Sequence, residues 1–144
     1  MPSSSPDLVP VVERLARATN AHDIEGIVAC FADEYALESP LHPARSFRGK
    51  AQVRRNWTQI LTAIPDLQAR VLRTATNSNS VWTEWEMAGT RRDGGKHLMR
   101  GVFIFGVVDG LLYWGRMFLE PVDESALDMD AALQAQVAAP RQAP

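Results

Sequence analysis

The chain has 144 residues, of which 46% are hydrophobic and 22% are charged, and its formal net charge is -2. A chain of this length and composition can bury a hydrophobic core as one globular domain. The slight negative charge provides no basic surface for phosphates, so we expect no nucleic-acid partner.

Residues 1–6 form a short polar leader that is unlike a secretory signal, and no apolar run reaches the length needed to span a membrane. Cys30 is the single cysteine, which excludes an intramolecular disulfide. We therefore expect a cytoplasmic protein with no membrane partner.

Three helices are expected in the first half of the chain. Apolar residues at three- and four-residue spacing predict a first helix that Asp7 caps. Asp23 caps the second helix, whose apolar side includes Phe31, and Pro40 stops a brief strand that follows it. The expected ranges are 7–19, 23–33 and 50–64 for the helices, 35–39 for the strand and 41–48 for an irregular loop.

The second half of the chain is rich in residues that favour strands. Four such runs are separated by Asn-, Asp- and Gly-containing turns, which predicts an antiparallel meander over 67–74, 81–90, 97–107 and 111–120. The Ala- and Gln-rich segment that follows predicts a loosely held helix to about residue 137. We therefore divide the chain into the leader, a domain over residues 7–122, and a C-terminal helix and tail over 123–144.

Several short motifs resemble those of the SnoaL-like family in the nuclear transport factor 2-like superfamily. Residues 20–27 and 30–34 are similar to the helical hairpin of steroid Δ-isomerases and SnoaL-like proteins, and 47–50, 65–67, 101–103 and 108–110 are similar to later motifs. The resemblance implies an α+β fold, a cone-shaped curved mixed or antiparallel sheet wrapped around the N-terminal helices, also called a cystatin-like α+β roll. These motifs are turns, caps and core positions, so they identify the fold better than the function.

The catalytic positions of related enzymes do not carry catalytic residues in this chain. The resemblance implies where a steroid isomerase would have its catalytic base, its tyrosine and its protonated acid. In this chain those positions hold Ser39, Leu15 and Gly101, respectively. Trp85 and Met87 stand where limonene-epoxide-hydrolase relatives have an arginine and a carboxylate. Neither reaction is expected here, because these side chains cannot supply the required proton transfers.

The period-two alternation of the strands separates two faces. The set that is free of charge predicts the concave face: Val81, Thr83, Trp85, Met87, Met99, Gly101, Phe103, Phe105, Tyr113, Gly115, Met117 and Leu119. The opposite set mixes aromatic and charged residues, which predicts a homodimer through the outer sheet face with Trp82, Glu84, Trp114, Arg116 and Phe118.

Candidate site residues follow from these faces and from the resemblance. The candidate general acids or bases are Glu120, the nearest carboxylate to that of a polyketide cyclase, together with His42 and Asp33. The three histidines are too dispersed for a metal site, so no metal is expected. We also expect no organic cofactor. The candidate substrate-binding residues are Leu15, Tyr35, Ser39, Trp57, Thr83, Trp85, Met87, Phe103, Phe105 and Met117.

The sequence leaves three functional hypotheses open. The first is a cofactor-independent cyclase, isomerase or hydrolase that acts on a hydrophobic metabolite held in an apolar pocket. The second is a non-catalytic binding protein for a small hydrophobic molecule. The third is a dimerisation module whose cone is filled by side chains. Alternatives to catalysis are that Asp33 ends the second helix and that Glu120 pairs with Arg116 or lies in a dimer contact.

Overall fold

The computed structural model describes residues 7–138, and the expected leader and the last residues of the tail lie outside this range. The sheet has six strands in the order β2-β1-β6-β5-β4-β3, with β1 parallel to β6 and the other neighbours antiparallel. Its strands are β1 (Phe31–Glu38), β2 (Phe47–Arg48), β3 (Gln68–Asn77), β4 (Ser80–Thr90), β5 (Lys96–Val108) and β6 (Leu111–Pro121).

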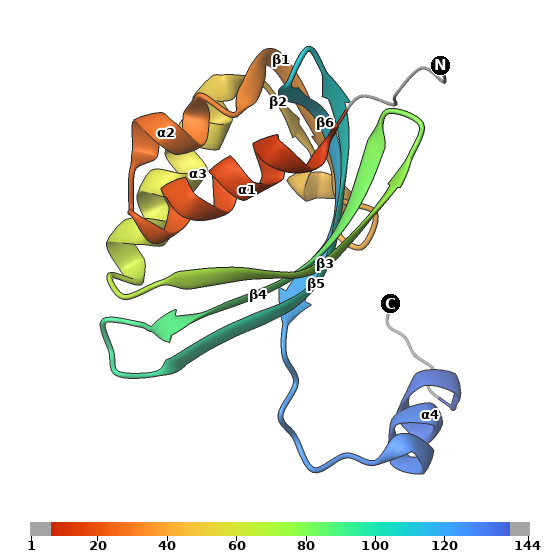
Figure 1. Ribbon diagram of the computed structural model, residues 1–144. Coiled ribbons are helices and arrows are strands. Elements are labelled where there is room, and N and C mark those ends of the chain that lie inside the picture. Colours follow the sequence, from red (N-terminus) through yellow and green to blue (C-terminus); the bar gives the residue numbers. More distant parts are fainter. Residues whose placement is uncertain (1–6, 139–144) are drawn as a thin grey trace.

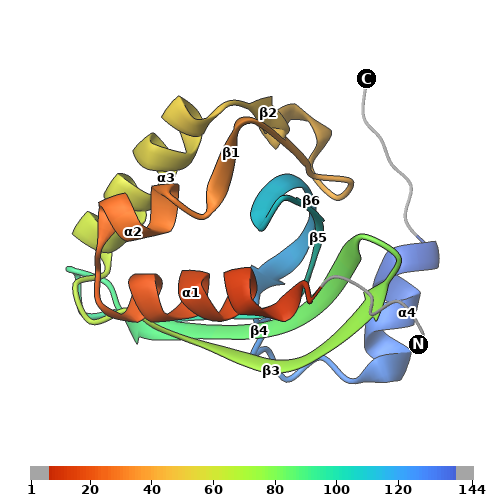
Figure 2. The ribbon, with the colours of Figure 1, turned by 45° about the horizontal axis from the view of Figure 1, so that its top comes forward.

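Three helices, α1 (Val9–Asn20), α2 (Ile24–Val28) and α3 (Lys50–Ala63), lie together on one side of the sheet, and α4 (Met129–Val137) stands apart from them (Figure 1). A short 3-10 helix, η1 (Pro43–Arg45), lies between β1 and β2. The sheet curves around α1, so the buried apolar side chains of both layers meet between the helices and the concave face (Figure 2). The predicted mixed α+β architecture is the one observed. Within the described residues, no helix is both long enough and apolar enough to cross a membrane.

The second helix is much shorter than the sequence predicts. Asp23 caps it as expected, accepting a hydrogen bond of 3.0 Å from the amide of Gly26, but the helix ends at Val28. Phe31 then begins β1 and pairs with Leu112, whose amide donates a 2.8 Å hydrogen bond to the carbonyl of Cys30. The expectation that helix 23–33 includes Phe31 and ends at Asp33 was wrong, because parallel pairing with β6 overrides the helical spacing of the apolar residues.

The strand register shifts at three places, between β1 and β6, between β3 and β4, and between β5 and β6, and the last of these is a bulge in β6. Gly106 pairs with Trp114 and Val107 pairs with Leu112, so Tyr113 is left without an opposite residue. Leu112 is fully buried, whereas Tyr113 is 39% exposed. Tyr113 was therefore wrongly assigned to the concave face.

Candidate functional site

A cavity of about 400 Å³ lies between α1, α3 and the concave face of the sheet. Its walls are almost entirely apolar and come from α1 and α3 and from strands β1, β2, β4, β5 and β6. The lining side chains are Leu15, Thr19, Phe31, Tyr35, Leu37, Phe47, Val53, Asn56, Trp57, Gln59, Ile60, Trp85, Met87, His97, Met99, Phe103, Phe105, Met117 and Leu119. A space of this size and character suits a small apolar molecule.

The structure brings eight of the ten candidate substrate-binding residues to this cavity. The eight are Leu15, Tyr35, Trp57, Trp85, Met87, Phe103, Phe105 and Met117. The six on strands meet because period-two alternation turns each strand's apolar side chains to one face, and Leu15 and Trp57 reach the cavity from α1 and α3.

The other two candidates, Ser39 and Thr83, are buried but do not line the cavity. The hydroxyl of Thr83 donates to the carbonyl of Phe103 at 2.6 Å and accepts from the indole N–H of Trp85 at 2.7 Å. Thr83 therefore positions Trp85, a lining residue. The amide of Ser39 donates to the hydroxyl of Ser46, which holds the loop after β1.

Tyr35 supplies a buried polar group to the cavity wall. Its side chain is 2% exposed, its ring packs edge-on against Phe31 at 4.7 Å, and its hydroxyl lies against Gly115. Burial raises the pKa of Tyr35 far above its ordinary value, so the hydroxyl stays protonated. Among the described residues its hydroxyl has no hydrogen-bond partner. A buried, protonated hydroxyl without a partner can donate a hydrogen bond to an oxygen of a bound molecule.

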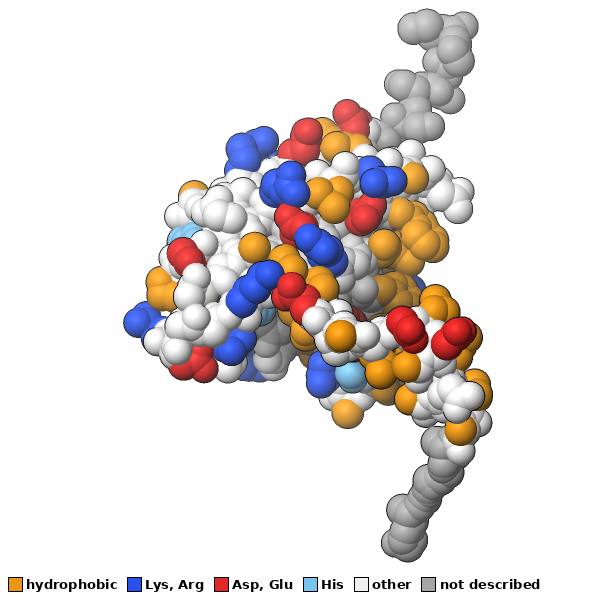
Figure 3. Space-filling model, turned by 90° about the horizontal axis from the view of Figure 1, so that it is seen from below, with side chains coloured by type: hydrophobic (Ala, Val, Ile, Leu, Met, Phe, Trp, Pro, Cys, Tyr) orange, Lys and Arg blue, Asp and Glu red, His pale blue; other side chains and the backbone are white. Residues whose placement is uncertain are grey.

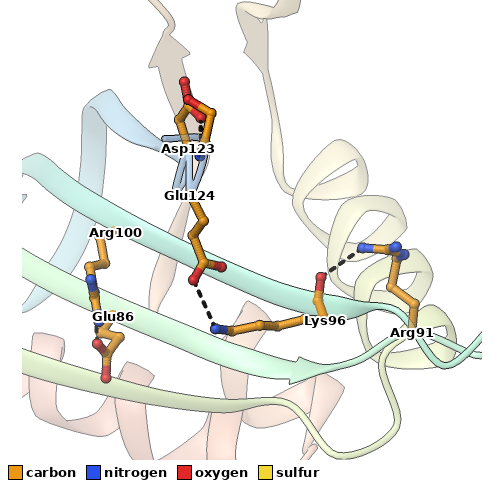
Figure 4. A network of polar contacts seen from close by, with 7 residues as sticks. Glu86, Arg91, Lys96, Arg100, Asp123 and Glu124 are labelled. Carbon is orange, nitrogen blue, oxygen red and sulfur yellow. Dashed lines mark hydrogen bonds and ion pairs between the residues drawn. The ribbon is translucent and has the colours of Figure 1, made fainter. Parts of the chain in front are cut away.

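A second polar group of the lining comes from His97 at the start of β5. Desolvation, and then the charge of Arg91, lower the pKa of His97 below its ordinary value, so the imidazole is neutral near pH 7. Arg91 lies at the turn before β5, where its guanidinium donates to the carbonyl of Lys96 at 2.8 Å (Figure 4). Asn56 and Gln59 of α3 line the same cavity. A neutral imidazole here can accept a proton.

The two polar groups are far apart along the sheet. Tyr35 touches Gly115, which pairs with Phe105 on β5. His97 lies eight residues from Phe105 on the same strand, about 27 Å of strand length at 3.4 Å per residue. The curvature of the sheet shortens the direct path. Tyr35 and His97 therefore lie at different parts of the cavity lining.

The three residues predicted as general acids or bases do not line the cavity. Glu120 lies on the outer face of β6 opposite Arg100, and its carboxylate is 2.9 Å from the imidazole of His42, each side chain being about one-third exposed. Asp33 is 91% exposed in β1 and lies 3.6 Å from the ammonium of Lys50. The structure joins two of the candidates to each other, but on the far side of the sheet from the apolar space.

The remaining histidine has a structural contact. The imidazole of His22 lies 2.9 Å from the carbonyl of Leu67 and so joins the turn after α1 to the start of β3. The described part of the chain contains no cluster of three or more His, Cys, Asp or Glu side chains that could hold a metal ion.

Sequence reasoning missed His97 as a lining residue. The signal was available, because His97 has the same parity on its strand as Met99 and Phe103, both predicted to face inward. Asn56 was also missed. It lies one residue before Trp57 on α3, and its amide oxygen accepts a 2.7 Å hydrogen bond from Gln52.

We expect the titration of His97 to report its position in the cavity. By ¹H NMR, its ring pKa should lie below the ordinary value of about 6.5, and Arg91→Gln should raise it only in part, because desolvation, the larger cause, remains. His97 is then neutral in the folded chain and more readily protonated in the unfolded chain. Its contribution to stability is complete above about pH 6.5 and is lost as the pH falls through the folded pKa. A ring pKa at or above the ordinary value would contradict this placement, with the signal assigned through His97→Asn.

Comparison with known proteins identifies one family for this chain. A family model described as the SnoaL-like domain matches residues 12–114. No match was found among curated proteins. Many solved structures share the fold, and three of them are described below.

Each of the three is less than 25% identical to this chain, so the likeness shows the fold alone. RV0760c from Mycobacterium tuberculosis, in complex with estradiol-17β-hemisuccinate, is 22% identical over 80% of this chain and 94% of its own, with a TM-score of 0.67. Wild-type IdmH from Streptomyces antibioticus, a candidate polyketide cyclase, is 18% identical over 79% and 92%, with a TM-score of 0.68. A SnoaL-like protein from Burkholderia thailandensis is 24% identical over 77% and 90%, with a TM-score of 0.59.

The family resemblance and the predicted fold class are both confirmed. The family model covers most of the described domain, and other solved neighbours have the ketosteroid isomerase-like and NTF2-like folds. The chain belongs to the SnoaL-like family.

Proposed function

We propose that this protein binds a small, flat, apolar molecule in its cavity and that the hydroxyl of Tyr35 donates a hydrogen bond to an oxygen of that molecule. The observation that carries the proposal is a buried hydroxyl without a hydrogen-bond partner among residues 7–138, in the wall of an apolar cavity of about 400 Å³. An unpaired hydroxyl is costly to bury, which favours a ligand that satisfies it. The estradiol derivative bound by RV0760c and the candidate cyclase role of IdmH support an oxygen-bearing polycyclic ligand.

A matched pair of probes tests this proposal. Fluorenone and fluorene share one ring skeleton, and only fluorenone carries a ketone oxygen. We expect Tyr35→Phe to weaken fluorenone binding about tenfold and to leave fluorene binding unchanged, because one hydrogen bond contributes about 1.4 kcal/mol. Binding is measured by tryptophan fluorescence, since Trp57 and Trp85 line the cavity.

The control is Tyr113→Phe, which changes the only other tyrosine, on the bulge of β6. Its binding of both probes should match that of the unchanged protein. Equal weakening of both probes by Tyr35→Phe would contradict the assigned hydrogen bond. Failure of both probes to bind, while the chain stays folded, would contradict the apolar binding site.

The favoured catalytic form of this proposal is cofactor-independent proton transfer, as in a cyclisation or isomerisation. His97 is the best candidate for the proton acceptor, because it lines the cavity and its lowered pKa keeps it neutral near pH 7. Tyr35 would bind a distant oxygen and orient the molecule, so it would act on binding more than on the proton transfer. A binding protein without catalysis would bind the probes with the same affinity and would show no activity that depends on His97.

We also propose a homodimer through the outer sheet face, over Trp82, Glu84, Trp114, Arg116 and Phe118. Trp82 is 48% exposed, an unusual position for a large aromatic side chain on a free sheet surface. Arg116 lies over the ring of Phe118 at 5.9 Å, and Glu84 pairs with Arg73 at 2.7 Å. Apolar side chains with paired charges beside them fit a self-complementary contact.

A further inference from the structure

The C-terminal arm, which we define as Val122–Val137, carries an apolar surface without a packing partner. Met129, Leu133 and Val137 follow one another at four-residue spacing on α4 and therefore form one stripe. Their exposed fractions are 71%, 46% and 78%, and that of Leu127, just before the helix, is 56%. No other described helix or strand packs extensively against α4.

An isolated helix of this length is not stable in water by itself. α4 has nine residues, whereas helices shorter than about 12 to 15 residues need tertiary packing. The chain nevertheless provides a specific start, because the carboxylate of Asp128 caps the helix through the amide of Ala131 at 3.0 Å. A capped helix with an apolar stripe fits a segment that folds against a surface.

The charges of the arm are complementary to the outer face of the sheet. The arm has four acidic residues, Asp123, Glu124, Asp128 and Asp130, and no basic one. On the outer face of β3, β4 and β5, four basic residues (Arg70, Arg73, Lys96 and Arg100) stand against two acidic ones (Glu84 and Glu86), an excess of two positive charges. Basic and acidic side chains alternate across this side of the molecule, with apolar side chains beside them (Figure 3).

The start of the arm is already fixed to this face. The amide of Val122 donates to the carbonyl of Leu98 at 3.0 Å, and the carboxylate of Glu124 lies 3.2 Å from the ammonium of Lys96 (Figure 4). Only three residues separate Glu124 from the cap Asp128, so α4 starts within about 14 Å of Glu124.

Within its own chain the arm starts near charged residues and far from the exposed aromatic side chain. Trp82 lies eight residues along β4 from Thr90, the partner of Lys96, about 27 Å of strand. The paired side chains of Glu86 and Arg100 lie between them, and covering these charges with apolar side chains is unfavourable. A second copy related by a two-fold axis can bring its Trp82 end to the arm instead.

We infer that the C-terminal arm packs its apolar stripe onto the outer sheet face of a second copy of this chain, so that two arms are exchanged in the homodimer. The acidic arm then faces the basic excess of that sheet. Each dimer buries two copies of Leu133, one from each arm. This inference rests on the proposed homodimer but not on ligand binding in the cavity.

The test compares two full-length variants that each add one acidic residue to α4. Leu133→Asp places the charge on the apolar stripe, and Gln134→Asp places it on the neighbouring exposed position. By sedimentation equilibrium, Leu133→Asp should raise the dimer dissociation constant at least about tenfold, because a buried leucine is removed at two symmetric contacts. Gln134→Asp should change it less than about threefold.

Hydrogen exchange separates the possible locations of the arm. In the unchanged chain, the amides of residues 131–137 should exchange slowly at concentrations that favour the dimer and rapidly on dilution. Slow exchange at every concentration would mean that the arm docks on its own chain, and rapid exchange at every concentration would mean that it does not dock. Either result overturns the inference. Fluorenone binding by the same samples shows separately whether the cavity proposal holds.

Discussion

Gly101→Ala should lower the free energy of unfolding by about 3 kcal/mol. Gly101 has a φ of 150° in the middle of β5, a backbone conformation that residues with a side chain rarely adopt. A Cβ at this position would lie 2.1 Å from the carbonyl oxygen of Phe118 and 2.8 Å from the Cα of Leu119. Because both neighbours are backbone atoms, the strand itself must move, which adds about 1–3 kcal/mol to a conformational cost of about 1–2 kcal/mol.

The control for this prediction is Gly94→Ala in the turn between β4 and β5. Gly94 also has a positive φ, 86°, but a Cβ there meets nothing within 4 Å. Its substitution should cost only the conformational part, about 1 kcal/mol. Urea denaturation of both variants isolates the steric part. Equal losses would show that β5 and β6 do not approach each other as closely at Gly101 as the structure indicates.

Gly115→Ala should reduce both stability and ligand binding, because it acts on the wall where Tyr35 lies. A Cβ at Gly115 would lie 2.3 Å from the hydroxyl oxygen of Tyr35 and 3.0 Å from the ring of Phe103. Tyr35 is too buried to turn away freely, so we expect a loss of about 2 kcal/mol and a weaker fluorenone complex.

The double variant identifies the cause of this loss. Tyr35→Phe removes the clashing oxygen and leaves the ring carbon at 3.3 Å, a tolerable contact. Tyr35→Phe alone should leave stability unchanged or raise it, because the hydroxyl has no hydrogen-bond partner to lose in the part of the chain that the structure describes. Together the two substitutions should recover about 1–2 kcal/mol of the loss from Gly115→Ala. Strict additivity in urea denaturation would contradict the contact.

Alternation along the strands predicted most of the cavity wall. Trp85, Phe103 and Met117 could be placed on one face because a strand repeats every two residues and the turns fixed where each strand begins. The same rule failed at Tyr113, because a bulge adds one residue without any mark in the composition.

Contacts between distant segments could not be predicted from the sequence. The second helix was extended to Asp33 because local spacing contains no information on the parallel pairing of Phe31 with Leu112. The pairing of His42 with Glu120 joins residues 78 positions apart, across the end of the sheet. The lack of a hydrogen-bond partner for the Tyr35 hydroxyl within the described residues is likewise a tertiary property, and it decides the proposed role of this residue.

The most direct test of the binding proposal is a crystal structure of the full-length protein with fluorenone. We predict density for the flat ligand between Trp85, Phe103 and Met117, with its ketone oxygen roughly 2.6–3.0 Å from the hydroxyl of Tyr35. A cavity closed by these same side chains, or a ligand whose oxygen points away from Tyr35, would contradict the proposal.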